Sequence, residues 1–311
     1  MRIGGKTRVA ALAIVVLVAL LLLNAFLVDR DTRAAHSFAG GQVVELEGPD
    51  LNVREYGSGG DRAIVLLHGY SASIEWWEQV APALASSGQR VIAIDLVGHG
   101  GSEAPRSDAD YGAVGQATAV TRALAALGVR HAVLIGHSMG GHVATAIAER
   151  EPALVDRIAV IDTFGAAGLI EMPLLGEIGC WPVIGAAVDR LRSVDALTED
   201  SLQTGFADDF EVPELAHRSL EQLTHRGVCE SSAADELNDE RAVAERLATI
   251  GKPVLVVWGE NDVLTPTDPN VDRYTQAGLE PQVIPVSGHS PMVEKPEALV
   301  ALLAPFASQA G

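Results

Sequence analysis

The chain has 311 residues, of which 48% are hydrophobic and 20% charged, and its formal net charge at pH 7 is −19. This composition excludes a disordered chain, a collagen and a small disulfide scaffold, because enough apolar residues are present to bury a large core. The negative charge and the 5% aromatic content exclude a nucleic-acid partner, which requires basic patches and aromatic stacking platforms. We expect one large or two ordinary globular domains.

The N-terminal segment differs from the rest of the chain. Basic side chains at residues 1–8 precede an apolar run at residues 9–28, in which Asn24 is the only strongly polar residue. A helix of this length is about 30 Å long, which matches the hydrocarbon core of a bilayer. We therefore predict a transmembrane signal anchor at residues 9–28, with residues 1–8 in the cytoplasm because basic residues stay inside.

Two other interpretations of this run stay open, namely a buried core helix and a cleaved signal peptide with a small-x-small site at residues 37–39. The run is longer than the apolar part of most signal peptides, which favours an uncleaved anchor. After a linker at residues 29–41, the remaining chain is then expected on the exported side of the membrane. It is secreted if the segment is cleaved.

From residue 42 onward, short apolar runs alternate with helix-like stretches. Strands are expected at residues 43–47, 51–56, 63–67, 91–95, 132–136, 158–162, 254–258 and 283–286. Helices are expected at residues 76–86, 113–127, 139–150 and 296–307. Apolar strands without strict alternation are typical of a parallel sheet covered on both faces. The pattern predicts a doubly wound, mostly parallel α/β sheet with its functional residues at the carboxyl ends of the strands.

The alternation stops over residues 163–252, which show helical periodicity and no convincing strand. We expect these residues to form a helical cap inserted between two segments of the α/β core, at residues 42–162 and 253–311. An apolar run opens the cap, at Leu169, Ile170, Met172, Leu174, Leu175, Ile178, Trp181, Val183 and Ile184. This run is expected either to pack between cap and core or to line an acyl pocket.

Both cysteines, Cys180 and Cys229, fall inside the expected cap. An oxidising compartment allows a disulfide that closes this region, whereas two buried thiols are the alternative. The sequence leaves these two outcomes equally open.

The strongest chemical signal is Gly136-His137-Ser138-Met139-Gly140, between an expected strand and an expected helix. Small residues at Gly136 and Gly140 allow a sharp turn that exposes the hydroxyl of Ser138, as in a nucleophile elbow. Ser138 is therefore the candidate nucleophile.

A nucleophilic serine needs a base and an orienting acid. Asp262 and His289 follow expected strands in the chain order serine, acid, histidine, so they complete a candidate catalytic triad. Asp162 also ends an expected strand and is the alternative acid. The backbone N–H groups of Tyr70, on a loop that begins His68-Gly69, and of Met139 are the candidate oxyanion hole.

These motifs together resemble the α/β-hydrolase superfamily, and the resemblance covers roughly residues 43–307. The motifs that carry it are His68-Gly69, Asp95-Leu96-Val97-Gly98-His99-Gly100-Gly101-Ser102, the Ser138 elbow, Gly259-x-x-Asp262 and Gly288-His289. Among its members the chain is most similar to cap-bearing serine esterases and monoglyceride-lipase-like hydrolases. Members with an aspartate nucleophile are disfavoured because Ser138 stands at the elbow.

The resemblance implies a serine hydrolase that cleaves carboxylic esters through an acyl-enzyme. If part of the apolar run lines an acyl pocket, the pocket and the membrane anchor together favour lipid-derived esters with hydrophobic acyl groups. Amide or carbon–carbon bond hydrolysis, perhydrolysis, acyl transfer and a noncatalytic membrane-tethered binding module stay open as alternatives. We expect no cofactor, since no phosphate-binding or dinucleotide-binding glycine motif is present. We expect no metal either, because His142, His217 and His225 lack ligand spacing.

Overall fold

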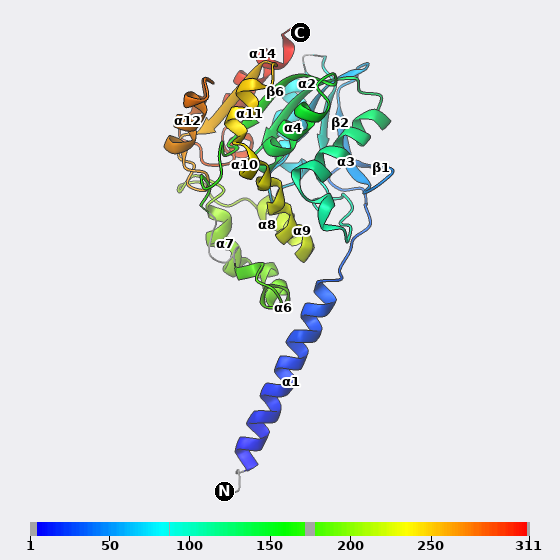
Figure 1. Ribbon diagram of the computed structural model, residues 1–311, viewed down its shortest axis with the longest axis vertical. Coiled ribbons are helices and arrows are strands. Elements are labelled where there is room, and N and C mark those ends of the chain that lie inside the picture. The colour runs from blue at the N-terminus through cyan, green and yellow to red at the C-terminus, as the bar shows by residue number, and fades with distance from the viewer. Residues whose placement is uncertain (1–4, 87, 172–177, 310–311) are drawn as a thin grey trace.

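A long apolar helix, α1 (Gly5–Val28), begins the structure and projects from one end of the globular part (Figure 1). The computed structural model describes residues 5–86, 88–171 and 178–309. Within these ranges, residues 9–28 form the only helix long and apolar enough to cross a membrane. Met172, Leu174 and Leu175 of the expected apolar run lie outside the described residues.

Eight strands form one sheet in the order β1-β2-β4-β3-β5-β6-β7-β8. Their bounds are β1 (Gln42–Val44), β2 (Leu51–Tyr56), β3 (Arg62–Leu67), β4 (Val91–Ile94), β5 (His131–His137), β6 (Val155–Ile161), β7 (Val254–Gly259) and β8 (Gln282–Ile284). The β1–β2 and β2–β4 pairs are antiparallel, and all the other pairs are parallel. The mostly parallel sheet expected from the sequence is confirmed, and every expected strand is present.

Helices cover both faces of this sheet. Those of the core are η1 (Ile74–Trp77), α2 (Val80–Ala85), η2 (Asp108–Asp110), α3 (Ala113–Ala126), α4 (Met139–Arg150), α12 (Thr267–Gln276), α13 (Pro291–Glu294) and α14 (Pro296–Ser308). Apolar residues of α3 and α4 pack against one face, and those of α2 and α14 pack against the other. The strands are therefore buried on both sides, which is why their sequences read as continuous apolar runs.

Two parts of the helical pattern differ from the sequence expectation. The stretch expected as one helix at residues 76–86 divides into η1 and α2, with Glu78 and Gln79 between them. In addition α12 forms where no helix was expected, and its Tyr274 is fully buried against Trp258 of β7. The sequence of α12 carries few apolar residues, so its hydrophobic periodicity is weak. Burial of the large Tyr274 side chain stabilises the helix instead.

The segment 163–252 is helical wherever the structure describes regular elements in it. These elements are α6 (Ile184–Val188), η3 (Asp189–Ser193), α7 (Asp195–Gln203), α8 (Glu214–Glu221), α9 (His225–Glu230), η4 (Ser231–Glu236), α10 (Leu237–Glu240) and α11 (Val243–Thr249). The elements α6 to α9 lie below the sheet, between the core and α1 (Figure 1). The last helix, α11, packs instead on α4 and α12, so the end of this segment lies on the core.

A disulfide joins Cys180 and Cys229, whose Cα atoms lie 5.4 Å apart. It ties the turn before α6 to α9. Of the two outcomes that the sequence left open for these cysteines, the structure has the bonded pair.

Candidate active site

Ser138 sits between β5 and α4 in a backbone conformation that is rare for a residue with a side chain, with φ +49° and ψ −119°. The turn is so tight that a Cβ on Gly136 would lie 2.3 Å from the carbonyl oxygen of Gly140. A Cβ on Gly140 would lie 2.3 Å from the carbonyl oxygen of Leu67. Glycine is thus required on both sides of Ser138, as the sequence pattern predicts.

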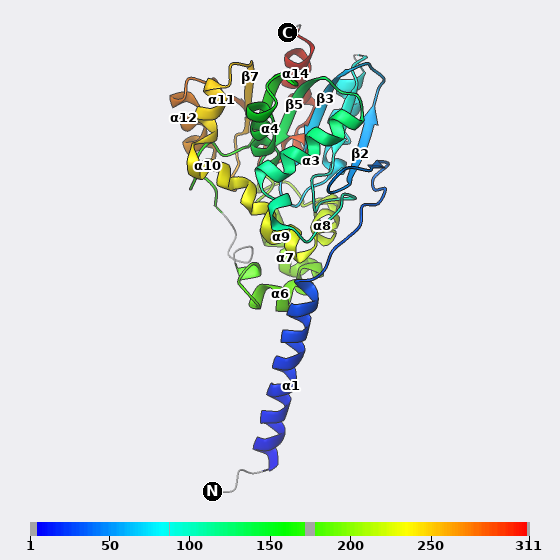
Figure 2. The same ribbon diagram turned by 45° about the vertical axis from the view of Figure 1, so that its right-hand side comes forward.

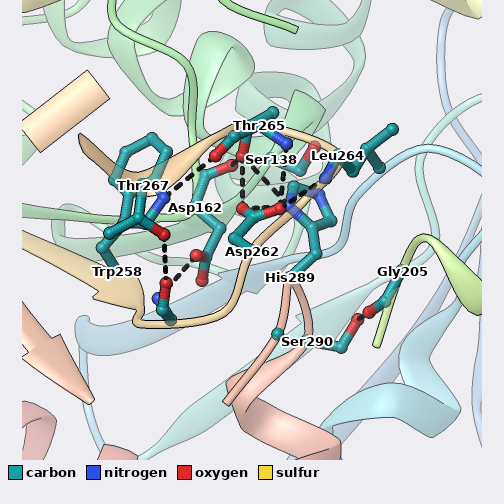
Figure 3. Close-up of polar contacts among 12 residues, drawn as sticks. Ser138, Asp162, Gly205, Trp258, Asp262, Leu264, Thr265, Thr267, His289 and Ser290 are labelled. Carbon is teal, nitrogen blue, oxygen red and sulfur yellow. Dashed lines mark hydrogen bonds and ion pairs between the residues drawn. The ribbon is translucent and has the colours of Figure 1, made fainter. Parts of the chain in front are cut away.

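His289 and Asp262 meet beyond the carboxyl ends of β8 and β7, close to this turn (Figure 3). The His289 Nδ1 and Asp262 Oδ2 atoms are 2.8 Å apart. The other carboxylate oxygen of Asp262 accepts the N–H groups of Leu264, at 2.9 Å, and Thr265, at 2.8 Å. These bonds hold the carboxylate so that it can fix the tautomer of His289 with Nδ1 protonated and Nε2 free to accept a proton.

Thr265 is a member of this group that the sequence reasoning missed. Its fully buried hydroxyl donates to Asp262 Oδ2 and lies 3.2 Å from His289 Nδ1. An Asp followed three residues later by Thr is a common local turn in which the side chain binds following backbone amides. That spacing was readable in the sequence, but it does not specify a contact with His289.

Asp162, the alternative acid, lies beside Asp262, and within the described part of the chain it makes no hydrogen bond to His289. Its Oδ1 accepts the backbone N–H of Gly259 at 2.7 Å. Burial, together with the nearby charge of Asp262, raises the pKa of Asp162 well above its ordinary value. Both effects favour the protonated form of the Asp162 carboxyl group. Of the two candidate acids, the structure brings Asp262 to His289.

The loop after β3 lies directly over the serine turn. A Cβ on Gly69 would lie 2.7 Å from His137 Nδ1 and 3.1 Å from the Ser138 Cβ, so the glycine allows this close approach. Among the described residues, the N–H groups of Tyr70 and Met139 have no hydrogen-bond acceptor. Both amides are thus available to an oxygen atom bound beside Ser138.

His68 holds this loop in place. Its Nε2 accepts the N–H of Leu96 at 3.0 Å, and its Nδ1 bonds the carbonyl oxygen of Gly69 at 2.7 Å. Both contacts require a neutral ring with the proton on Nδ1. Burial lowers the pKa of His68 to about 4, which is consistent with that neutral state.

His137, next to Ser138 in the elbow, contacts the loop that carries His289. The His137 Nε2 lies 2.7 Å from the carbonyl oxygen of His289, so the ring donates its N–H there. Burial lowers the pKa of His137 well below its ordinary value. The neutral ring therefore ties the elbow to the His289 loop, which is a structural role.

Glu294 is a second residue that the sequence reasoning missed. Its buried carboxylate accepts the backbone N–H groups of Gly288, at 3.0 Å, and Ser290, at 3.1 Å, which flank His289. It also accepts the N–H of Ala207, in the cap, at 3.0 Å. Three backbone donors are the reason that a charged side chain is tolerated in this buried place.

Between Ser138 and His289, the structure records no hydrogen bond among the described residues. Catalytic hydrogen bonds are often long in the absence of substrate and shorten only in the complex. The Ser138 side chain is largely covered, since the residue is 7% exposed. Substrate must therefore displace part of the covering wall, or enter past it.

Aromatic side chains pack next to the elbow. Trp76 stacks on His137, with ring centroids 6.4 Å apart, and on Phe206 of the cap, at 5.8 Å. In contrast, Trp181, Val183 and Ile184 of the expected apolar run are each more than half exposed, at 53%, 55% and 52%. Of the two roles expected for the run, packing between cap and core is therefore wrong for these three residues, because α6 lies at the outer end of the cap.

Asp162, Asp262 and His289 place one ligand-type atom each within 4.8 Å of one another. The oxygens of Asp262 and the Nδ1 of His289 are already engaged with each other and with Thr265. A cation here would have to compete with the contact between His289 and Asp262. The geometry thus suits proton transfer better than metal binding.

The three other histidines considered as ligands lie apart from this group. His217 contacts Glu199 at 3.0 Å, and His225 contacts Asp189 at 3.1 Å. His142 is buried beside Phe164. Within the described ranges, they do not join any further set of three possible metal ligands.

Known proteins share this architecture. The chain is 24% identical over 261 residues to monoacylglycerol lipase abhd6-B of Xenopus laevis, covering 80% of this chain and 76% of that protein. The solved structure of a membrane phospholipase A, described as a bacterial virulence factor, is 27% identical, with a TM-score of 0.68 and 98% of each chain covered. That of Est816, an N-acyl homoserine lactone degrading enzyme, is 29% identical, with a TM-score of 0.66, covering 85% of this chain and 100% of that one.

Residues 62–196, which include the loop after β3 and the serine turn, match the sequence profile of the family described as the alpha/beta hydrolase fold. The strand order, the turn at Ser138 and the helical insertion after β6 agree with that match. The chain belongs to the α/β-hydrolase superfamily and is a hydrolase.

Proposed function

We propose that the protein is a membrane-anchored serine hydrolase that cleaves carboxylic esters, with Ser138, His289 and Asp262 as its catalytic triad. The observation that carries this proposal is the strained turn of Ser138 beside the hydrogen-bonded pair of His289 and Asp262. A serine hydroxyl is a weak nucleophile, and such a pair is what activates it. Backbone strain at a non-glycine residue also marks functional sites.

In the first half of the reaction, the Ser138 Oγ attacks the ester carbonyl carbon while its proton passes to His289 Nε2. The carbonyl oxygen becomes an oxyanion, which accepts hydrogen bonds from the free N–H groups of Tyr70 and Met139. Asp262 stabilises the imidazolium that forms on His289. Collapse of the intermediate breaks the bond to the leaving alcohol, which takes the proton from His289, and leaves an ester of Ser138.

In the second half, water replaces the alcohol. The water oxygen attacks the acyl carbon while His289 Nε2 takes a proton from that water. The amides of Tyr70 and Met139 again hold the oxyanion. Collapse returns the proton to Ser138 Oγ and releases the carboxylic acid. The side chains and amides of this chain supply every group that both halves need.

Two observations favour an ester with a hydrophobic acyl group. Trp76 stacks on His137, the neighbour of Ser138 in the chain, and the stack continues through Phe206 to Phe210, which gives apolar surface close to the elbow. The chain is also similar to a monoacylglycerol lipase and to a membrane phospholipase A, both enzymes of lipid esters by name. With α1 as an uncleaved membrane span and the N-terminus in the cytoplasm, such substrates would come from the bilayer itself.

Labelling with a fluorophosphonate probe tests the nucleophile directly. The full chain is expected to carry the adduct on Ser138, located by mass spectrometry, and the variant His289→Ala is expected to lose it. A folded protein that takes no label would favour the noncatalytic binding module instead. A panel of esters, amides and diketones then separates ester cleavage from amide or carbon–carbon bond cleavage, and added alcohols or peroxide reveal acyl transfer or perhydrolysis.

The membrane span has its own test. Vesicles that contain the full chain are floated after a wash at alkaline pH, and N-terminal sequencing shows whether residues 1–28 remain. Flotation of the intact chain supports an uncleaved anchor, whereas a soluble product that lacks the segment supports a cleaved signal. Protease added outside intact cells then reports the side on which the catalytic domain lies.

A further inference from the structure

The only strongly polar residue of the apolar run at residues 9–28 has a defined partner. Asn24, in the last turns of α1, donates its side-chain amide to the carbonyl oxygens of Ala186, at 3.3 Å, and Ala187, at 3.1 Å, in α6. Ala25 and Val28 bury their side chains against Ala186 beside these bonds. Both views show α6 next to the globular end of α1 (Figures 1 and 2).

This contact fixes the depth of α6 relative to the proposed membrane span. Asn24 lies four residues before the end of α1 at Val28, which corresponds to about 6 Å along a helix axis. If residues 9–28 cross a bilayer, α6 lies at the level of the last turns of the span. Helices that rest in the membrane interface lie about 5–10 Å deep, at the boundary of headgroups and acyl chains.

The turn before α6, the start of α6 and η3 expose apolar side chains. Trp181, Val183 and Ile184 are each more than half exposed, and Leu191 in η3 is 53% exposed. A soluble protein gains nothing from exposing a tryptophan and three branched side chains together, and such patches mark sites of contact. Tryptophan in particular favours the membrane interface, because its ring is apolar and its N–H is polar.

The turn that carries these residues is built to point them outward. Val183 has φ +66°, a conformation that a β-branched residue rarely adopts. The neighbouring Gly185 packs so closely that a Cβ there would lie 1.9 Å from the carbonyl oxygen of Gly179. The disulfide from Cys180 to Cys229 ties this turn to α9. A strained, cross-linked turn that ends in exposed apolar side chains is preorganised for a contact.

We propose that this surface, formed by Trp181, Val183, Ile184 and Leu191 and called the cap tip here, rests in the interface of the same lipid bilayer that α1 spans. The bilayer is the occupant because Trp181 and Val183 of the cap tip line one cleft with Phe26 of α1, the helix proposed to cross the bilayer. This cleft has a volume of about 550 Å³ and opens at the same level. Lipid chains would fill it.

The proposal rests on the membrane span but not on the chemistry at Ser138. It implies that the cap lies on the membrane instead of swinging freely at the end of a linker. The linker is also fixed, since the Arg33 guanidinium donates to the carbonyl oxygens of Ser102 in the core and Gln222 in the cap. Core, cap and span would therefore hold one orientation at the bilayer surface.

Tryptophan fluorescence tests the proposal on the full chain in phosphatidylcholine vesicles. The sequence has 4 Trp, and Trp76, Trp77 and Trp258 are buried, so Trp181 is the exposed one. We expect its emission to be quenched by lipids that carry a doxyl group near the headgroup and to resist iodide in the water. The variant Trp181→Phe should remove this quenched component.

Two matched controls calibrate depth in the Trp181→Phe background. Leu27→Trp, on the last turn of α1, should be quenched to the same extent as Trp181, whereas Val283→Trp, on the edge strand β8, should be quenched by iodide and not by lipid. If Trp181 behaves like the Val283 control while the Leu27 control is quenched, the chain spans the bilayer and the cap tip is free of it, which overturns the proposal. If Trp181 resists both quenchers, a second copy or another protein covers the cap tip, and the proposal is equally wrong.

Discussion

The active-site region and the cap tip are stabilised in opposite ways. At the carboxyl ends of the strands, Ser138, Asp262 and His289 are buried, and each lies on a loop anchored by several buried hydrogen bonds. At the cap tip, Trp181 and its apolar neighbours are exposed, and one disulfide and the Asn24 contacts hold the turn. The sheet thus positions the residues of the proposed reaction. A few long-range contacts position the cap relative to α1. Substitutions in the active-site region should therefore leave the cap tip intact, and substitutions in the cap tip should leave the active site intact.

The largest effect is expected from Ser138→Ala, which removes the proposed nucleophile without altering the fold. Turnover of a soluble ester should fall by at least about 10³-fold, by comparison with triad knockouts in other serine hydrolases. The matched control is Ser290→Ala, whose hydroxyl bonds the carbonyl oxygen of Gly205 at 2.7 Å, and which should cost about 1 kcal/mol of stability and little activity. Steady-state kinetics on both variants measure the two turnover rates. Equal rates for the two variants would remove Ser138 from the mechanism.

Glu294 links the His289 loop to the cap, since it accepts both amides that flank His289 and the amide of Ala207. Glu294→Leu leaves three buried N–H groups unpaired, so we expect a loss of at least about 3 kcal/mol in unfolding free energy. In Glu294→Gln, which keeps one acceptor oxygen, a shift of His289 should lower kcat by about 10- to 100-fold with a smaller change in KM. Urea unfolding and kinetics measure the two effects. A Gln variant with unchanged kcat would show that the His289 loop needs no such support.

Removal of the disulfide should act on the cap alone. A chain with Cys180→Ala and Cys229→Ala is expected to lose about 2–4 kcal/mol of stability, because the cross-link no longer restricts the unfolded cap. Hydrogen exchange should rise in α6 to α9 and stay unchanged in β3, β5 and β6. The reduced wild-type chain serves as the control, since it should show the same pattern. Faster exchange throughout the sheet would mean that the cap and core unfold as one unit.

An acid titration should instead weaken the core. His68 is neutral in the folded protein, with a pKa of about 4, whereas an unfolded histidine has a pKa of about 6.5. The unfolded chain therefore binds the additional proton, and stability present above pH 6.5 is lost as the pH falls toward 4, by on the order of 3 kcal/mol. His68→Gln should be less stable at neutral pH but lose less on acidification. Urea unfolding from pH 7 to 4 compares the slopes, and parallel curves would contradict the assignment.

The sequence predicted the core far better than the cap, for a physical reason. Strands covered on both faces and the glycines around Ser138 leave strong local patterns, so the sheet and its turn can be read directly. The contacts of Thr265 and Glu294 could not be, because those side chains bind atoms whose positions only the finished fold defines. Similarly, two cysteines do not reveal whether they are joined. The outward direction of Trp181 depends on a strained turn that no periodicity indicates.

The smallest effect is expected from Asn24→Leu, which tests whether the anchor and the cap are coupled. The variant keeps the length of α1 and raises its hydrophobicity, so the chain should still enter the membrane. It loses two hydrogen bonds to α6, worth about 0.5–1.5 kcal/mol each, so the amides of α6 and η3 should exchange faster in vesicles. Ser138 should keep its reactivity toward a soluble fluorophosphonate, because no contact that the structure describes for Asn24 reaches the core. The matched control is Leu23→Ala, on the exposed side of the same turn of α1, which should leave α6 unchanged. If Asn24→Leu slows labelling of Ser138, the contact between α1 and α6 affects the active site. The position of the cap and the reactivity of Ser138 are then coupled in this chain.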